Sequence, residues 1–380
     1  MSASQRAKGV TVTSGAAGAV TSSAAGAVTS SAAGAVTSSA AGAVTSSAAE
    51  KYSSDQQVRW CPGCGDYSIL KQVESVLAQH GRPKEEIVFI SGIGCSSRFP
   101  YYLDTFGMHS IHGRAPAIAS GMRSVQPDLS VWLITGDGDS LSIGGNHLIH
   151  LLRRNVDLNV LLFNNEIYGL TKGQYSPSSP EGAISRSSPM GSTDHPFNPL
   201  ALSKGADATF IARSMDRDPK HLREMLQRAD AHRGTSLLEI YQNCNVFNDG
   251  AFEVFTEKAT KPLNTVFVEH GKPLLFANGT KGIKLDGMTP VAVDFSNGGA
   301  SANDLWVHDE RDSFKADILV RLFDDPRKKD ALPRPFGVFY VNERSTHEAK
   351  MNAQVALAKQ KKGDGDLDAL LRGENVWTIA

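Results

Sequence analysis

Short apolar runs alternate with helix-like stretches along most of this chain. The runs have the length of buried strands, and the segments between them have the length of helices. This order predicts an α/β fold with a doubly wound, mostly parallel sheet covered by helices on both faces. The expected strands are 87–91, 131–135, 160–164, 208–212 and 236–240, and the expected helices are 67–80, 115–125, 141–154 and 219–232.

The alternation begins only after a low-complexity segment. Residues 11–48 repeat an eight-residue unit made of Ala, Gly, Ser, Thr and Val. Such a repeat buries too little apolar surface to offset a backbone ordering cost of about 1–2 kcal/mol per residue. We therefore expect a disordered tail over residues 1–51, a main ligand-binding domain over 52–250 and a C-terminal extension over 251–380.

Composition excludes several classes of protein. The 380 residues include 39 Lys and Arg against 40 Asp and Glu, a balance that argues against a large nucleic-acid surface. No stretch approaches the roughly 18 consecutive apolar residues of a membrane-spanning helix. Four cysteines are too few for a disulfide scaffold, and no leader peptide is recognisable. We expect a cytoplasmic protein with neither nucleic acid nor membrane as a partner.

A glycine-rich turn follows the expected strand 131–135. Residues 136–140 read Gly-Asp-Gly-Asp-Ser and lead into an expected helix. Glycines at such a turn let backbone amides approach a phosphate closely, and the helix N-terminus adds a favourable dipole. The carboxylate of Asp137 suits a hard cation such as Mg²⁺. The turn alone is also compatible with an ordinary tight loop.

A pair of asparagines, Asn164 and Asn165, follows the next strand. Asn165 lies 28 residues after Asp137. Because the carboxyl ends of neighbouring parallel strands meet at one sheet edge, we expect Asp137 and Asn165 to lie close together. This combination and spacing resemble the signature of thiamine diphosphate enzymes, in which a glycine-flanked aspartate and an asparagine anchor the cofactor through Mg²⁺.

The cysteines form a second candidate site. Cys61 and Cys64 have CxxC spacing around a Pro-Gly turn, while Cys95 and Cys244 each follow an expected strand. Four soft thiolates suit a [4Fe–4S] cluster or a structural zinc ion. Spacing alone also leaves open a redox-active CxxC pair or a set of unrelated buried thiols.

Six motifs in one order carry a family resemblance. They are WCPGCG (60–65), GIGCSSRFP (92–100), HGRAPA (112–117), GDGDSLSIGGNH (136–147), NNEIYGLTKGQ (164–174) and the late Cys244. Together they resemble the β subunit of 2-oxoacid:ferredoxin oxidoreductases, most closely the 2-oxoglutarate branch. The resemblance covers residues 57–250, is weak after residue 252, and implies the fold of thiamine diphosphate-binding enzymes.

The resemblance implies ligands for two metal groups. In this family four cysteines hold one [4Fe–4S] cluster, and Mg²⁺ anchors thiamine diphosphate through two side chains and one backbone oxygen. The matching cysteines are Cys61, Cys64, Cys95 and Cys244, and the matching Mg²⁺ ligands are Asp137, Asn165 and the backbone oxygen of Ile167.

The resemblance also implies contacts to the cofactor and the substrate. His112 would lie near the thiamine, Arg98 would face a substrate carboxylate, and Lys172 would lie in a loop linked to substrate choice. The residues implied for the cofactor are Gly136, Asp137, Gly138, Asp139, Asn165, Ile167, Gly169, Leu170 and Thr171, and those implied for catalysis and substrate are His112, Arg98, Leu170 and Lys172.

The implied reaction is a reversible, coenzyme A-dependent oxidative decarboxylation of 2-oxoglutarate to succinyl-CoA and CO₂. Electrons would leave through the cluster to ferredoxin. We find no convincing glutamate for activating thiamine in this chain, and in the family the α subunit supplies it. We therefore expect an obligate α subunit, on which residues 251–380 would pack, in an (αβ)₂ assembly.

Two readings from other classes remain at this point. A thiamine diphosphate-dependent lyase or synthase without a cluster would share Asp137 and Asn165 but would not need four placed cysteines. A non-catalytic scaffold subunit with structural zinc would use the cysteines and bind no thiamine.

Overall fold

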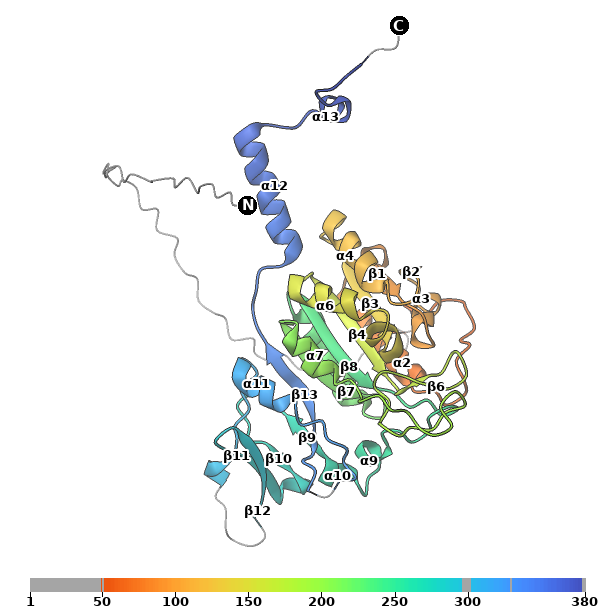
Figure 1. Ribbon diagram of the computed structural model, residues 1–380, viewed down its shortest axis with the longest axis vertical. Coiled ribbons are helices and arrows are strands. Elements are labelled where there is room, and N and C mark those ends of the chain that lie inside the picture. The colour runs from red at the N-terminus through yellow and green to blue at the C-terminus, as the bar shows by residue number, and fades with distance from the viewer. Residues whose placement is uncertain (1–48, 50, 296–301, 329, 378–380) are drawn as a thin grey trace, which may run out of the picture. The chain divides into compact units, whose positions relative to one another are not determined.

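The computed structural model describes residues 49, 51–295, 302–328 and 330–377. Within these residues the central sheet contains eight strands (Figure 1). These residues belong to one compact unit, Val44–Ala380. The strands are β1 (Ile87–Ser91), β2 (Phe106–His109), β3 (Ser130–Gly136), β4 (Leu158–Asn164), β7 (Phe210–Met215), β8 (Thr235–Tyr241), β9 (Thr265–Val268) and β13 (Arg334–Val341).

Strand order and direction confirm the doubly wound sheet. The order is β2-β1-β3-β4-β8-β7-β13-β9, and every neighbouring pair from β2 to β7 is parallel. Strand β13 joins β7 in the antiparallel direction, and β9 is parallel to β13. The result is the mostly parallel sheet that the alternation of elements predicts.

Helices cover both faces of the sheet. Along β1, Val88 and Ile90 join one hydrophobic core, whereas Ile87 and Phe89 join the other. This alternation explains the unbroken apolar runs, because a parallel strand buried on both faces needs apolar residues at every position. One face carries α2 (Asp66–His80) and α8 (Pro219–Ala231), and the other carries α4 (Ala115–Val125), α6 (Gly145–Arg154) and α7 (Pro199–Gly205).

The expected helix 141–154 is divided in the structure. It becomes α5 (Asp137–Leu141) and α6, and Ser142 between them has φ −91° and ψ −110°. A Cβ added at Gly144 would lie 2.4 Å from the backbone oxygen of Asp139, so the chain packs against itself too closely for any side chain. The break places the turn after β3 in a short helix of its own.

Strands on both sides of residue 250 belong to the central sheet, since β9 and β13 follow that position. The division at residue 250 stays a prediction, and the expected tail, residues 1–51, lies outside the described residues except for Ala49 and Lys51. The remaining α-helices and strands of the described residues are α3 (Phe99–Tyr102), β5 (Ile167–Tyr168), β6 (Gln174–Tyr175), α9 (Glu253–Thr256), α10 (Lys261–Asn264), β10 (Leu275–Phe276), β11 (Lys281–Asp286), β12 (Thr289–Asp294), α11 (Ser313–Leu319), α12 (His347–Lys362) and α13 (Leu367–Arg372).

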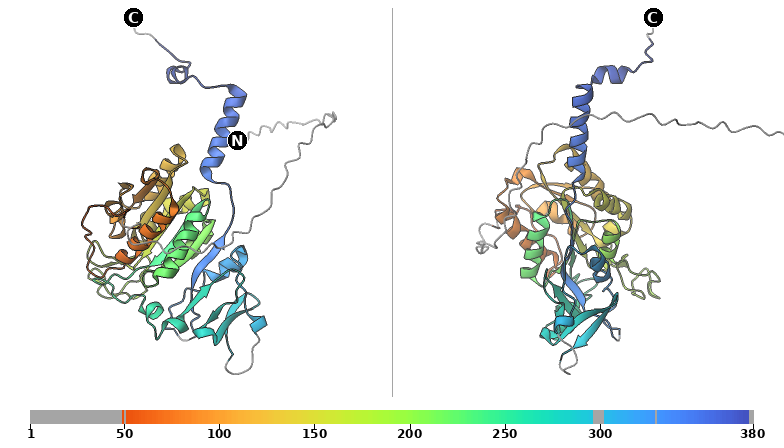
Figure 2. Two further views of the ribbon diagram at one scale, coloured as in Figure 1. Left: turned by 180° about the vertical axis from the view of Figure 1, so that it is seen from behind. Right: turned by 90° about the vertical axis from the view of Figure 1, so that its left-hand side faces the viewer.

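Helix α12 follows β13 and leaves the sheet, as both views of Figure 2 show. Its first turn is held by buried Glu348, whose Oε1 accepts hydrogen bonds from Arg123 Nη2 at 3.2 Å and from the Asp157 amide at 3.0 Å. Across the described residues, no helix combines the length and apolar composition that crossing a bilayer requires.

His221 on α8 should couple stability to pH. Its Nδ1 lies 2.8 Å from Ser214 Oγ and its ring meets Phe267 edge-on, and burial lowers its pKa from 6.5 to about 4. Between pH values of about 6.5 and about 4, the unfolded chain therefore binds a proton at His221 that the folded chain does not bind. We expect the free energy of unfolding to fall as pH drops from about 6.5 to about 4, by at most about 1.4 kcal/mol per pH unit for this residue.

Urea melts of the native chain and of His221→Asn at pH 7 and pH 5 measure this effect. The variant should lose part of the pH dependence, because His232 has the same lowered pKa and remains in place. An identical pH dependence in both proteins would contradict the prediction.

Candidate functional site

The glycine-rich turn lies at the carboxyl end of β3, as predicted. Gly136 ends the strand, Asp137 begins α5, and the residues of α5 are buried. The Tyr168 hydroxyl donates a hydrogen bond to the backbone oxygen of Gly138 at 2.9 Å. A Cβ at Gly138 would lie 2.2 Å from the Tyr168 ring, so a glycine is required here by packing as well as by any close approach of a phosphate.

Asp137 is a buried carboxylate with hydroxyl partners. It is 2% exposed, and its Oδ2 accepts hydrogen bonds from Ser176 Oγ and Ser178 Oγ, both at 2.5 Å. Burial raises its pKa, and the two hydroxyls act in the opposite direction. None of the described Lys, Arg or His side chains forms an ion pair with it. A buried acid without a cationic partner is costly, so its position fits a divalent cation.

The asparagine pair lies at the end of the neighbouring strand β4. The Asn164 side chain donates to Glu239 Oε1 at 2.8 Å, and its Oδ1 lies 2.9 Å from Ser178 Oγ, whose single proton it shares with Asp137 Oδ2. The Asn165 side chain accepts from the Ile167 amide at 3.2 Å and donates to Gln242 Oε1 at 2.8 Å. The structure therefore connects Asn164, rather than Asn165, to the partners of Asp137. The role of Asn165 and of the Ile167 backbone oxygen as Mg²⁺ ligands stays a prediction.

Asp139 organises the loops around the turn. Its Oδ1 accepts hydrogen bonds from His112 Nδ1 at 2.6 Å, from the Gly113 amide at 2.7 Å and from the Ile93 amide at 3.1 Å. Its Oδ2 accepts from the Thr135 hydroxyl at 2.8 Å. Because Nδ1 of His112 is held by this carboxylate, the ring has a fixed orientation, and its side chain is 40% exposed. No hydrogen bond from the described residues reaches Nε2 of His112.

A methyl group at Gly138 should disturb this turn. Gly138→Ala would push the Tyr168 ring away, and overpacking of this kind costs about 1–3 kcal/mol. Gly121→Ala is the matched control, because Gly121 lies in α4 with open space around it, where alanine favours the helix by roughly 0.5–1 kcal/mol. Urea melts should therefore shift in opposite directions. Equal shifts would show that Tyr168 does not restrict the turn.

The four cysteines line one cavity of about 200 Å³. Cys61 and Cys64 precede α2, Cys95 follows β1, and Cys244 follows β8. The loops that carry them are hydrogen-bonded to one another. The bonds run from the Gly65 amide to the Asn243 oxygen (3.1 Å), from Asn245 Nδ2 to the Pro62 oxygen (2.6 Å) and from Gln242 Nε2 to Cys64 Sγ (3.2 Å).

Cationic side chains line the cavity, while burial and the buried Asp66 beside Cys64 raise the pKa of Cys64 and Cys95. Arg59, Arg98 and Lys172 line it, and the described lining side chains include no carboxylate. Burial is the main cause of a raised thiol pKa, which reaches about 12 for Cys95 and also rises for Cys64. Without a metal the thiols of Cys64 and Cys95 are therefore protonated, and a metal must displace those protons.

The spacing of the sulfurs bears on the kind of metal group. Within the described ranges, no three His, Cys, Asp or Glu side chains are grouped closely enough to hold one metal ion. A zinc ion would need its sulfurs about 2.3 Å from a single centre. Four thiols around one cavity suit an iron–sulfur cluster, with a zinc ion as the alternative.

The segment Asn165–Gly169 joins the two candidate sites. A Cβ added at Gly169 would lie 3.5 Å from Cys244 Sγ and 3.6 Å from Cys95 Sγ. Asn165 also lines the cysteine cavity, while the ring of Tyr168 packs on Gly138. The glycine-rich turn and the cysteine cavity are thus neighbours at one sheet edge.

The expected substrate residues lie at the same edge. Arg98 is half-buried in the cavity lining, and its guanidinium makes no hydrogen bond or ion pair with the described residues. Leu170 is 45% exposed, and Lys172 is exposed with φ +77°. The Thr171 hydroxyl bonds to the side chain of Gln174 within its own loop.

Several residues of the site have no sequence motif. They are the buried hydroxyls of Ser176, Ser178 and Ser179, the Glu239 carboxylate and the Gln242 amide. His147, which has the spacing of a metal ligand relative to His150, instead contacts the Arg114 guanidinium.

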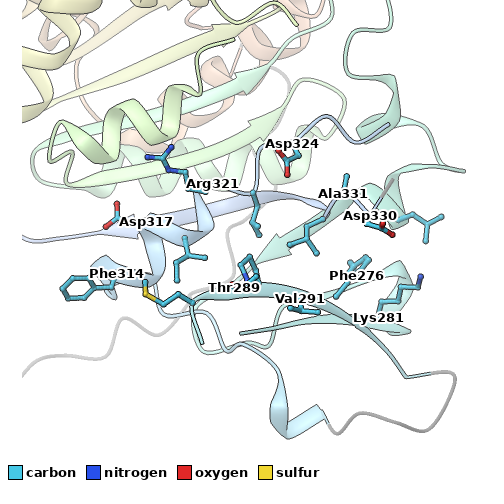
Figure 3. A pocket seen from close by; sticks show the side chains of 17 residues that line it. Phe276, Lys281, Thr289, Val291, Phe314, Asp317, Arg321, Asp324, Asp330 and Ala331 are labelled. Carbon is cyan, nitrogen blue, oxygen red and sulfur yellow. The ribbon is translucent and has the colours of Figure 1, made fainter. Parts of the chain in front are cut away.

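A larger cavity of about 1010 Å³ lies elsewhere, between α11 and the sheet of β10, β11 and β12. Figure 3 shows Phe314, Val291 and Phe276 along it, with Asp317 and Arg321 on the α11 side. Its lining residues fall between Leu263 and Leu332, so it contains none of the predicted site residues.

The parallel sheet and the turn at its carboxyl edge place the protein among thiamine diphosphate enzymes. The family described as "Thiamine pyrophosphate enzyme, C-terminal TPP binding domain" matches residues 92–240. The chain is 48% identical over 340 residues to 2-oxoglutarate oxidoreductase subunit KorB of Mycobacterium tuberculosis, a match that covers 86% of this chain and 87% of that protein. The chain therefore belongs to the KorB-type β subunits of 2-oxoacid oxidoreductases.

Two further proteins agree with this assignment. The chain is 40% identical over 209 residues to 2-oxoacid:ferredoxin oxidoreductase subunit beta of Sulfolobus sp., covering 54% of this chain and 68% of that one. It also matches a solved structure of 2-oxoglutarate:ferredoxin oxidoreductase from Magnetococcus marinus with 2-oxoglutarate, coenzyme A and succinyl-CoA bound. That match has a TM-score of 0.66 and 30% identity and covers 85% and 94% of the two chains. The resemblance carried by the six motifs is confirmed.

Proposed function

We propose that this chain is the β subunit of a 2-oxoglutarate:ferredoxin oxidoreductase. The enzyme would convert 2-oxoglutarate and coenzyme A reversibly into succinyl-CoA and CO₂, and ferredoxin would accept the electrons. One observation carries the proposal: the turn with Asp137 and the cavity with four cysteines share a sheet edge, joined by Asn165–Gly169. A decarboxylation site and an electron outlet are expected to be adjacent in such an enzyme.

Different residues of this chain would bind the Mg²⁺ and the diphosphate of the cofactor. Asp137, Asn165 and the Ile167 backbone oxygen would hold Mg²⁺, and the amides of Gly138 and Asp139 would bind the diphosphate. Thiamine diphosphate, when bound, supplies the electron sink that decarboxylation of a 2-oxoacid requires.

Two side chains would act on the substrate. His112, oriented by Asp139 through Nδ1, would hold or release a proton at Nε2. Arg98 has a two-pronged guanidinium suited to a carboxylate, and it is not engaged by the described residues. Leu170 and Lys172 would border the substrate and influence which 2-oxoacid is accepted.

The four cysteines would hold the cluster through which electrons leave the active site. Cys61, Cys64, Cys95 and Cys244 would each lose a proton and bind one iron of a [4Fe–4S] cluster. The cationic side chains of Arg59 and Lys172 in the lining would offset the added negative charge. A lyase without a cluster would have no use for this converged set, and metal analysis separates an iron–sulfur cluster from a zinc ion held by the same thiols.

The site needs a second subunit for completion. We propose an obligate α subunit and an (αβ)₂ assembly. The glutamate that activates thiamine is expected from the α subunit, because we find no convincing one in this chain. We place the complex in the cytoplasm, where cluster-binding thiols stay reduced.

Co-expression with the α subunit tests the proposal. The purified complex should contain iron and thiamine diphosphate. It should reduce ferredoxin in a reaction that depends on coenzyme A, faster with 2-oxoglutarate than with pyruvate or a branched 2-oxoacid. A complex that reduces no acceptor with any 2-oxoacid would refute the proposal, and a preference for pyruvate would refute the substrate.

A further inference from the structure

A buried serine loop lies between the two halves of the cofactor site. Ser176, Ser178 and Ser179 follow β6, and each is at most 3% exposed. Three hydroxyls in a buried loop are costly unless each one is hydrogen-bonded. Their partners therefore show what the loop is for.

The loop bonds to both cofactor motifs. Ser176 Oγ and Ser178 Oγ donate to Asp137 Oδ2 after the glycine-rich turn of β3. Ser178 Oγ also lies 2.9 Å from Asn164 Oδ1, and Ser179 Oγ donates to the Glu166 backbone oxygen at 2.5 Å. One short loop thus fixes the Asp137 carboxylate relative to the segment that follows β4.

A buried ion pair also holds the side chain of Asn164 in place. Asn164 Nδ2 donates to Glu239 Oε1 at 2.8 Å, and Glu239 Oε2 accepts from Arg213 Nε at 2.6 Å. Glu239 and Arg213 are almost completely buried on the neighbouring strands β8 and β7. Because Glu239 takes the amide nitrogen of Asn164, the amide oxygen must face Ser178.

The two serines also define which oxygen of Asp137 serves a metal ion. Both hydroxyls use Oδ2, which leaves Oδ1 without either donor. A ligating carboxylate is usually oriented in this way by partners of its second oxygen, and loss of one such partner typically costs about 10–100-fold in metal affinity.

We propose that Ser178, supported by Ser176, is a positioning residue that orients Asp137 for the Mg²⁺ of thiamine diphosphate and ties the Asp137 turn to the Asn164 segment. The inference rests on the proposed function. The site is then prearranged before the cofactor arrives, so little of the binding energy is lost to ordering its ligands.

The test measures cofactor binding by the full chain in complex with its α subunit. Equilibrium dialysis gives the Kd of thiamine diphosphate at one fixed, subsaturating Mg²⁺ concentration for the native complex and for Ser178→Ala, Ser178→Thr and Ser187→Ala. Ser187 is the matched control, because it is an exposed serine of the same connection. Iron content and the melting temperature without cofactor are recorded for each complex.

We expect Ser178→Ala to weaken cofactor binding about tenfold with unchanged iron. Ser178→Thr, which keeps the hydroxyl, should recover most of the loss, and Ser187→Ala should match the native complex. An unchanged Kd in Ser178→Ala would overturn the inference. The inference would also be overturned if Ser178→Ala lost cofactor binding together with a lowered melting temperature and Ser178→Thr did not restore binding. That pattern indicates a purely structural serine.

The outcome also separates this inference from the proposed function. A native complex that binds no thiamine diphosphate would overturn both. A native complex that binds it, beside a Ser178→Ala complex that binds equally well, would overturn the serine inference alone.

Discussion

Asp137→Ala should leave a folded chain that retains no thiamine diphosphate. The variant removes the carboxylate that we assign to Mg²⁺, and it removes the shared acceptor of Ser176 and Ser178. The fold should persist, because none of the described basic side chains pairs with Asp137 and its burial raises its pKa. Loss of an unpaired buried charge relieves a desolvation cost, which offsets the lost acceptor, and both serines keep polar neighbours in Asn164 Oδ1 and Ser179 Oγ.

Thiamine diphosphate content of the complex with the α subunit after gel filtration measures the effect, with circular dichroism as the check on folding. Asp128→Ala is the matched control, since Asp128 is exposed before β3 and should be replaceable without loss of cofactor. Asp137→Asn should also lose the cofactor, because a neutral amide keeps the size but not the charge. Undiminished cofactor content in Asp137→Ala would remove Asp137 from the metal site.

The parallel core of the fold was predictable from residue patterns. Strand β1 and helix α4 have the bounds expected from the sequence, Ile87–Ser91 and Ala115–Val125. A strand buried on both faces is apolar at every position, and this run is visible without any knowledge of its neighbours. The rule that ligands bind at the carboxyl ends of parallel strands then placed Asp137 and the asparagine pair at one edge.

The margins of the sheet were not predictable in this way. Strand β2, Phe106–His109, has three exposed residues out of four, so its sequence lacks the apolar run that marks a buried strand. Strand β13 pairs with β7, although more than one hundred residues separate them. Such pairing is decided by tertiary packing, and local periodicity carries no information about it.

The site shows the same division between local and long-range information. The cysteines and the Asp137 turn have motifs, whereas Ser176 reaches Asp137 across 39 residues from a segment that reads as an ordinary Ser-Pro turn. Sequence spacing also could not show which asparagine joins the hydrogen-bond network around Asp137. Asn164 and Asn165 are adjacent and their side chains engage different partners, Glu239 and Gln242.

Cys244→Ser should abolish the cluster while leaving thiamine diphosphate in place. A [4Fe–4S] cluster is held by four thiolates, and a serine hydroxyl is too weak an acid to replace one. Cys244 lies in the cavity lining and takes no part in the hydrogen bonds of Asp137, so the two cofactors should be lost independently. The fold should survive, because Cys244 is only partly buried and the replacement is nearly isosteric.

Iron and sulfide analysis, visible absorption and thiamine diphosphate content measure this outcome on the complex with the α subunit. Val246→Ser is the matched control, because Val246 is 54% exposed in the same loop and should keep full iron. Serine at Cys61, Cys64 or Cys95 should reproduce the loss, since all four cysteines of the chain line one cavity. An unchanged iron count in Cys244→Ser, or zinc in place of iron in the native complex, would contradict the assignment of these thiols to an iron–sulfur cluster.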